Sequence, residues 1–304
     1  MKVVSYLCSV PPGNKNPEKE NILRYFIQGV NTLGDQGILH NNHTLIDCDV
    51  AVIQGWVHEG SKNSAHLMFR KSIVDKQRND GKHVLIADSN LFLYADKNNP
   101  HHYLRYSFNG VFPTTGNYFN SIVDPSRWSQ ISKDHNINLK PWRTTGNHIL
   151  ICTQRNGGWS MKGFDVVKWL EKTVTEIRKY SSRSIVVRAH PGDKNAIHYL
   201  NSKDPRWTIS NKEKITDDFL NAWAVITYNS SPAVAAAIEG IPVFVTDPTP
   251  QVSQAFAVAN TTLSSIEDPS MPNRESWVNS ISMCHWNFLE LSNGTAWKNI
   301  KQYV

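Results

Sequence analysis

Apolar runs of strand length alternate with longer helix-like segments in the first half of this chain of 304 residues. The apolar runs cover residues 2–10, 49–57 and 82–92, and the segments between them run from Pro17 to Gly34 and from Ser64 to Asn79. This alternation is typical of a parallel sheet covered by helices, because parallel strands need a crossover connection. The first half is therefore predicted to be an α/β unit.

The same alternation begins again in the second half. A strand is expected at residues 148–153 and a helix at 164–180. Four more strands are expected, at residues 184–190, 206–210, 224–229 and 241–246. We therefore expect a second α/β unit of the same kind.

A linker is expected between the two halves, because Pro141 and Gly146 interrupt any helix there. We expect two Rossmann-like domains, residues 1–145 and 146–270. The tail, residues 271–304, is expected to be helical and to cross back to the first domain.

Composition narrows the classes of protein. Hydrophobic residues make up 40% of the chain and charged residues 19%, which suits packed cores and not a disordered chain. A net charge of +6 favours a polyanionic partner or substrate. The four cysteines lie far apart, so neither a disulfide framework nor a zinc site is expected.

No apolar segment approaches the roughly 20 residues that span a bilayer, and the first residues resemble a strand more than a signal peptide. A cytoplasmic protein is expected.

Polar residues follow the strands of the second half where those strands end, which is where ligands of open parallel sheets bind. The first such corner consists of Gln154, Arg155, Asn156, Gly157, Gly158, Trp159 and Ser160. Adjacent glycines let backbone amides approach an oxygen-rich group, and an arginine can pair with phosphate through two hydrogen bonds. The segment lacks the GK[ST] and GxGxxG patterns, and an ordinary Gly-Gly turn is the alternative.

A second corner, Arg188-Ala189-His190-Pro191, follows the next strand. Arg188 and His190 are expected on one face, because side chains alternate along a strand. Pro191 ends the strand and is expected to direct the imidazole into a ligand cleft. A histidine with no ligand is the alternative.

The third corner has Ser230 and Ser231 before Pro232 and a helix of small residues that closes on Gly240. A helix N-terminus carries unpaired N–H groups and is suited to anions, so a phosphate group is expected there. Plain helix capping by serine is the alternative. Thr246-Asp247-Pro248 forms a fourth corner with a weaker pattern.

These corners together describe a pocket for a diphosphate or a phosphate-sugar. The pairs His190-Pro191 and Ser230-Ser231 resemble the HP and Ser-Ser motifs of GT-B glycosyltransferases, including bacterial sialyl- and capsule-type transferases. The run at 240–245 resembles the strand that follows the Ser-Ser helix in that family. Four longer segments resemble glycosyltransferases encoded by tailed phages: residues 103–119, 154–161, 186–194 and 272–286.

The resemblance implies an α/β GT-B fold, with two Rossmann-like domains facing across a cleft and a C-terminal crossover helix. It implies a nucleotide-sugar co-substrate, with a UDP-sugar as the first candidate, and no further cofactor. Some members of the phage group modify hydroxymethylated cytosine, so duplex DNA is the implied acceptor. No membrane and no obligate protein partner is expected, and a phage-encoded protein would act in the host cytoplasm.

The expected chemistry is stabilisation of the negative charge that develops on a leaving nucleotide phosphate. Arg155, Arg188 and the amides after Ser230 are the candidate groups, and no metal is required. The sequence Asp47-Cys48-Asp49 has the form of a metal motif. It precedes its strand and so lies at the wrong edge of the sheet, which favours a structural turn.

A transfer that inverts configuration also needs a general base for the acceptor hydroxyl. Asp88 is the first candidate, because it ends a strand of the first domain, and His58 and Glu59 are the second. Asp88 as a simple turn residue is the alternative. A transfer that retains configuration would need no dedicated base.

Residues 96–130 show no clear period and are expected to be long functional loops. Arg105, Tyr106 and Asn109 are the candidate acceptor-binding residues there, since nucleic acids favour basic and aromatic groups. The aromatic residues could instead pack the two domains together. Two other functions stay open, namely transfer to a cell-surface or capsule-type glycan and non-catalytic binding of nucleic acid or sugar-phosphate.

Overall fold

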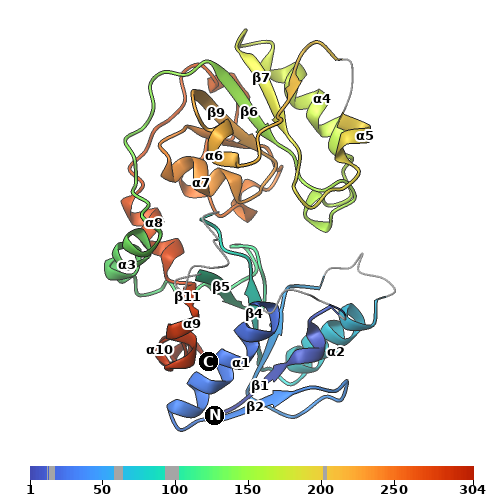
Figure 1. The fold of residues 1–304 in the computed structure, drawn as a ribbon, viewed down its shortest axis with the longest axis vertical. Helices are drawn as coiled ribbons and strands as arrows, with labels where there is room; N and C mark the ends of the chain where they lie inside the picture. Colours follow the sequence, from blue (N-terminus) through green and yellow to red (C-terminus); the bar gives the residue numbers. More distant parts are fainter. Residues whose placement is uncertain (12, 14–17, 58–63, 93–102, 201–203) are drawn as a thin grey trace. The chain divides into compact units, whose positions relative to one another are not determined.

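The structure is a computed structural model that describes residues 1–11, 13, 18–57, 64–92, 103–200 and 204–304 (Figure 1). The chain forms two compact units. The first unit is built from the described residues of Met1–Asn90, Tyr94–Ile137 and Val278–Val304. The second is built from those of Leu91–Leu93 and Asn138–Trp277.

The first unit contains a six-stranded sheet in the order β11-β5-β4-β3-β1-β2. Its strands are β1 Lys2–Tyr6, β2 Gln36–His40, β3 Val50–Gln54, β4 His83–Asp88, β5 Tyr103–Phe108 and β11 His285–Asn287. The four strands β2, β1, β3 and β4 run parallel, while β5 is antiparallel to β4 and β11 is antiparallel to β5. Its helices are α1 Glu18–Thr32, α2 Ala65–Asn79, α3 Pro125–His135, α9 Phe288–Ser292 and α10 Thr295–Ile300.

The second unit contains a five-stranded parallel sheet in the order β10-β9-β6-β7-β8. Its strands are β6 His148–Cys152, β7 Ser184–Arg188, β8 Thr208–Ile209, β9 Ala222–Thr227 and β10 Val243–Val245. Its helices are α4 Val166–Ile177, α5 Ala196–Leu200, α6 Ile215–Asp218 and α7 Pro232–Ile238, and α8 Glu275–Ser282 begins in this unit and ends in the first.

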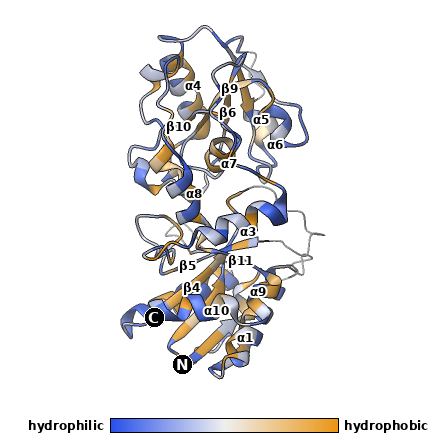
Figure 2. Ribbon diagram, turned by 90° about the vertical axis from the view of Figure 1, so that its left-hand side faces the viewer, coloured by the Kyte–Doolittle hydropathy of each residue, from blue (hydrophilic) through white to orange (hydrophobic). Residues whose placement is uncertain are grey.

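Short 3₁₀ helices complete the two units, at Leu7–Ser9, Trp159–Met161, Pro250–Val252, Phe256–Val258, Leu263–Ser265 and Lys301–Tyr303. Inner strands of both units, such as β4 and β9, are largely apolar (Figure 2). Continuous apolar runs such as β9, buried at every residue, are expected where helices cover both faces of a sheet. No helix among the described residues is long and apolar enough to cross a bilayer.

The second sheet has a topological switch between β6 and β9. The chain leaves β6 through α4 and returns as β7 on one side, whereas it leaves β9 through α7 and returns as β10 on the other side. The two connections diverge above the carboxyl ends of β6 and β9. A crevice for ligands is expected at such a point.

The expectation of loops across residues 96–130 was wrong for two parts of the described stretch. Residues Tyr103–Phe108 form β5, which is buried at all six positions, and Pro125–His135 form α3. A strand that is buried on both faces shows no alternation of polar and apolar residues, so its period could not be recognised. The strand β11 in the expected helical tail was missed because three residues are too few to show any period.

The contacts divide the chain at different residues from those expected. Residues 138–145 pack with the second unit, where the amides of Lys140 and Arg143 donate to the carbonyls of Ile238 and Gly240. At the other end, residues 271–277 also stay with the second unit, and the chain joins the first unit from Val278.

The C-terminal segment is an integral part of the first unit. The strand β11 extends the sheet beside β5, and α9 and α10, red in Figure 1, lie against the blue helix α1. Trp297 of α10 is fully buried and stacks edge-on against Phe26 of α1. The first core therefore cannot close without the last residues of the chain.

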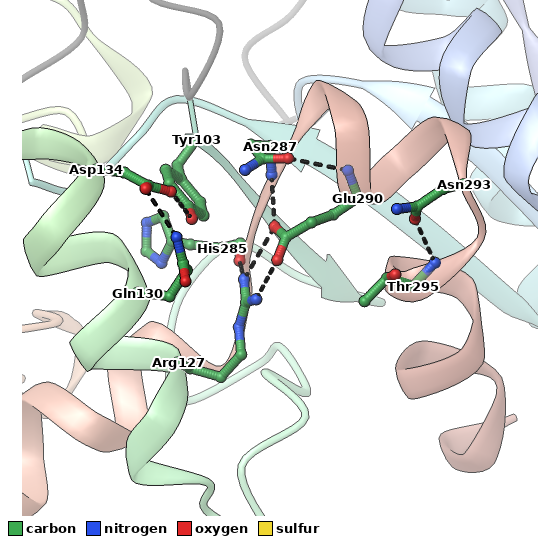
Figure 3. Close-up of polar contacts among 9 residues, drawn as sticks. All are labelled: Tyr103, Arg127, Gln130, Asp134, His285, Asn287, Glu290, Asn293 and Thr295. Atoms are coloured by element: carbon green, nitrogen blue, oxygen red, sulfur yellow. Dashed lines mark hydrogen bonds and ion pairs between the residues drawn. The ribbon is translucent and has the colours of Figure 1, made fainter.

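A buried ion pair fastens α3 to this segment (Figure 3). The guanidinium of Arg127 pairs with the carboxylate of Glu290, donates to the carbonyl of His285 and lies 4.0 Å from the ring centre of Trp286. Glu290 also accepts the amide of Asn287 in a capping box that begins α9. The side chains of Arg127 and Glu290 are only 10% and 15% exposed, so the pair is shielded from water.

Replacing Arg127 by methionine should destabilise the protein by about 3 kcal/mol, because it leaves a buried carboxylate without its partner. Urea unfolding measures this loss. The control is Lys71→Met, which breaks the exposed pair between Lys71 and Asp75 and should cost under about 0.5 kcal/mol. Equal losses of unfolding free energy in the two variants would contradict a larger contribution of the Arg127 pair to stability.

Candidate phosphate site at the edge of the second sheet

A buried carboxylate lies beyond the end of β10. The side chain of Asp247 has no exposed surface. One of its oxygens accepts from Lys162 Nζ at 3.1 Å and from the Thr249 amide at 2.8 Å, and the other accepts from Asn229 Nδ2 at 2.7 Å. A buried carboxylate needs such donors, since desolvation of the charge is otherwise costly. Asp247 thus links the segments that follow β6, β9 and β10.

The loop after β6 joins this network through two of the expected site residues. Gln154 Nε2 donates to Ser160 Oγ at 2.6 Å, and Gln154 Oε1 accepts the amide of Asn229 at 3.1 Å. Asn229 Nδ2 also donates to the Ser160 carbonyl at 3.2 Å. Gln154 and Ser160 therefore hold the loop against Asn229, the residue immediately before Ser230.

Ser230 and Ser231 stand at the start of α7, which begins with Pro232. Neither serine caps the helix with its side chain; their carbonyls accept from the amides of Ala233 and Val234. Within the described part of the chain, the Ser230 hydroxyl oxygen is buried without a hydrogen-bond partner, and the amides of both serines have no acceptor. These three groups are suited to an anion.

The two glycines of the loop after β6 shape a turn and do not offer their amides. Gly157 has a φ of 68°, which favours glycine, and its amide donates to Asn156 Oδ1 at 3.1 Å. The amide of Gly158 donates to the Arg155 carbonyl at 2.9 Å. This position of the amides does not fit the expected role of Gly157 and Gly158 in binding oxygen directly. For Trp159 only the backbone is described, in the 3₁₀ turn Trp159–Met161.

His190 and Arg155 lie together after β7 and β6. The Gly192 amide donates to His190 Nδ1 at 3.0 Å, so the neutral imidazole carries its proton on Nε2. Burial lowers the pKa of His190, and the positive charge of Arg155 lowers it further, although Asp193 opposes both effects. A β-carbon added at Gly192 would meet the end of the Arg155 side chain and approach the His190 ring at 3.1 Å, so the three residues are packed closely together. His190 therefore presents a neutral N–H donor beside an arginine.

Asp193 ties the two loops to each other. Its carboxylate accepts the amide of Asn156 at 2.8 Å, the amide of Asn195 at 3.2 Å and the hydroxyl of Tyr199. Burial raises the pKa of Asp193, but these hydrogen bonds outweigh that effect and the net pKa is lowered. The loop after β6 is thus fixed to β7 as well as to β9.

Arg188 does not contribute to this site as expected. Its guanidinium pairs with Asp218 and donates to the carbonyls of Lys212 and Glu213, at 3.1 and 2.8 Å. Asp218 is itself buried and bonded to Ser210. Arg188 therefore anchors the segment 210–218 to β7, and its donors are directed to the protein.

In the first unit, Asp88 ends β4 and lies opposite Arg105 of β5. The Arg105 guanidinium donates to one carboxylate oxygen of Asp88, and the Ser89 amide donates to the other at 2.7 Å. Arg105 is 8% exposed, and its guanidinium lies 5.9 Å from the ring centre of Tyr118. Arg105 thus orients Asp88, a contact that the sequence did not suggest.

Two other expected acceptor residues occupy structural positions. Tyr106 is fully buried and stacks on Phe26 in the core. Asn109 accepts the amide of Val84 at 2.9 Å, near the start of β4 and at the opposite end from Asp88. Neither position fits contact with an acceptor. His58 and Glu59 lie outside the described residues.

The Asp47-Cys48-Asp49 segment lies at the amino end of β3. Asp47 pairs with Lys76 at 2.5 Å, and Asp49 accepts the amide of Lys2 at 2.7 Å. Cys48 is buried between them. The described residues contain no cluster of three or more histidines, cysteines or carboxylates that could hold a metal ion.

The sequence reasoning missed the residues that hold the site together, namely Lys162, Asp193 and Asn229, and it gave Asp247 little weight. Asn229 and Asp193 directly adjoin recognised motifs, so their position was a usable signal. No sequence pattern pointed to Lys162. Its backbone is left-handed, with a φ of 51°, and this conformation cannot be predicted from the pair Lys162-Gly163.

No protein-family model matches this sequence, and no curated protein matches it. Among solved structures, the chain is similar to Thermosulfurimonas dismutans KpsC, beta Kdo 2,4 transferase, with a TM-score of 0.60 and 12% identity over 94% of this chain and 92% of that chain. It is also similar to the beta Kdo 2,7 transferase of the same name and organism, with a TM-score of 0.51 and 13% identity over 99% and 100% of the two chains. The similarity confirms the α/β GT-B fold class that the sequence suggested.

His190 should titrate below the ordinary histidine value of about 6.5. Because its folded pKa is depressed, its contribution to stability is complete above the unfolded pKa and is lost as pH falls through the folded pKa. NMR titration of its ring proton measures the midpoint. Arg155→Gln should raise that midpoint, whereas Arg206→Gln, a change in the same unit, should leave it in place. An unchanged midpoint in Arg155→Gln would contradict the pairing of the two side chains.

Proposed function

We propose that this protein transfers a sugar from a nucleotide-sugar donor and that the donor phosphate binds at the carboxyl end of the second sheet. The observation that carries the proposal is the hydroxyl of Ser230 beside the amides of Ser230 and Ser231, three groups that have no hydrogen-bond partner among the described residues. These groups lie at the topological switch, where ligands of this type of sheet bind. The fold shared with two sugar transferases supports the same conclusion.

The surrounding side chains suit a leaving phosphate. Arg155 supplies a positive charge, and His190 supplies a neutral Nε2–H donor. Lys162 is 41% exposed, so its ammonium can share its hydrogen bonds between Asp247 and an incoming anion. Groups that are already oriented stabilise the charge of a departing nucleotide without reorganising during the reaction.

For the acceptor hydroxyl, we propose Asp88 as the general base of an inverting transfer. Its carboxylate is 29% exposed at the end of β4, and each oxygen has one protein donor, which leaves lone pairs for the proton of an acceptor. Arg105 acts as its positioning residue and not as the acceptor-binding residue that we first expected. The first unit then binds acceptor and the second binds donor.

For the acceptor itself, we propose hydroxymethylated cytosine in duplex DNA. The resemblance of four segments to phage-encoded transferases and the net charge of +6 support this acceptor. The test is incubation with UDP-, GDP- and CMP-sugars and hydroxymethylcytosine DNA, followed by mass spectrometry of the nucleosides. An added sugar mass is expected with one donor. No added mass with any donor would remove the DNA acceptor.

The second candidate acceptor is a cell-surface or capsule-type glycan, which the shared fold with the Kdo transferases favours. Binding of duplex DNA that weakens steeply with salt separates the two, because DNA binding releases counterions. A protein that binds nucleotide-sugar but neither transfers nor hydrolyses it would instead be a binding protein.

Ser230→Ala should weaken binding of the matching free nucleotide by about tenfold, the effect of one hydrogen bond to a charged group. Calorimetric titration measures this change. The unfolding free energy should not fall, because the Ser230 hydroxyl has no partner in the described part of the chain. Loss of stability together with unchanged nucleotide binding would contradict the proposed role.

Lys162→Met should lower kcat/KM on the order of 100-fold, because it removes a positive charge from the developing phosphate charge and also removes the charged partner of the buried Asp247. Steady-state kinetics with the identified donor measures the loss. Lys179→Met, which removes an exposed lysine from the same unit, is the matched control and should change kcat/KM less than twofold or about 0.4 kcal/mol. Equal rates in both variants would exclude Lys162 from the reaction.

A further inference from the structure

A second concave site lies within the second unit, on the side of the strand ends that faces α4. Its volume is about 390 Å³, within the usual range for small-molecule pockets. Helix α4 lines it with Lys168, Trp169 and Lys172, and the segments after β9 and β10 line it with Tyr228 and Thr246.

This pocket and the proposed phosphate site use different side chains of the same two segments. Tyr228 and Thr246 line the pocket, whereas their neighbours Asn229 and Asp247 bond to each other in the phosphate-site network. The pocket is therefore distinct from that network, although the two adjoin each other along the chain.

Three aromatic side chains line the pocket, those of Phe164, Trp169 and Tyr228. The rings of Phe164 and Trp169 each lie 6.2 Å from the ring of Tyr228, measured between ring centres. Trp169 is held in place by its indole N–H, which donates to Thr246 Oγ1 at 2.9 Å. Phe164 is 53% exposed, so its ring is accessible to a ligand. Such a wall favours a flat, apolar ligand body.

Tyr228 supplies a polar group without a protein partner. Its side chain is 2% exposed, and within the described residues its hydroxyl makes no hydrogen bond. Burial raises the pKa of Tyr228 to about 12, with a smaller contribution from Asp247, so the hydroxyl keeps its proton and can donate. Buried polar groups are normally satisfied, so this hydroxyl indicates a missing partner.

The charges at the rim favour an anion. Lys168 and Lys172 are one helical turn apart, and neither forms an ion pair within the described residues. The two acids of the rim have partners of their own. Asp165 caps α4 by accepting from the amides of Val167 and Lys168, and Glu176 bonds to Lys179 at 2.6 Å. Lys172 also lies near Glu176, which leaves Lys168 as the less compensated cation.

We propose that this pocket binds a small aromatic anion, whose ring packs against Phe164 and Tyr228 and whose negative group pairs with Lys168. The volume, the aromatic side chains, the hydroxyl without a partner among the described residues and the lysine outside any ion pair support one and the same class of ligand. This inference does not depend on the proposed transferase activity, and it implies that the ligand and a nucleotide can bind at the same time.

The test uses 1-naphthyl phosphate as the probe, in calorimetric titrations of the full-length protein. The probe should bind at least tenfold more tightly than 1-naphthol or inorganic phosphate alone. Lys168→Gln should weaken it about tenfold, the effect of one charge-assisted hydrogen bond. Phe164→Ala should also weaken it. Both side chains are exposed, so neither change should unfold the protein. Lys212→Gln, a change of an exposed lysine of the same unit that does not line the pocket, is the matched control and should leave binding unchanged.

Three outcomes would overturn the proposal. The first is no binding of the probe at millimolar concentration, and the second is equal binding by the wild type and Lys168→Gln. The third is loss of binding in Arg155→Gln or competition by a nucleotide, because the probe would then occupy the phosphate site. Additive binding of probe and nucleotide would support two separate sites.

Discussion

The arrangement of the second unit depends on a carboxylate that has no access to water. Asp247 is surrounded by Lys162, Asn229 and the Thr249 amide, and these donors come from three different connections of the sheet. A buried charge tolerates little displacement of its donors, because an unpaired carboxylate in a protein interior is costly. The loops at the carboxyl ends of β6, β9 and β10 are therefore held in one geometry.

That geometry leaves a set of donors without acceptors in the described part of the chain. The backbone amide of Asn229 donates to Gln154, and its side chain donates to Asp247. The amide and hydroxyl of the following residue, Ser230, therefore lie at the switch between β6 and β9. On the other side of β6, Asp193 holds the loop that carries Arg155 next to His190. Donors that are fixed before a ligand arrives favour a phosphate and its developing charge.

The sequence predicted the fold class well, because alternating apolar runs and helices admit few arrangements other than covered parallel sheets. Its failures have two causes. The strand β5 is buried on both faces and shows no period. Arg188 ends its strand, but its guanidinium is bonded to Asp218, 30 residues away in sequence. Positions at strand ends can be read from local pattern, whereas the partner of a charged side chain is set by tertiary contacts.

A crystal structure with a nucleotide-sugar bound would test the central claim most directly. The phosphate is expected within hydrogen-bond distance of the Ser230 and Ser231 amides and the Ser230 hydroxyl, with Arg155 and His190 on the adjoining side. Arg188 should remain bonded to Asp218. A donor bound elsewhere, with the Ser230 hydroxyl still unpartnered, would contradict the assignment of this edge as the phosphate site.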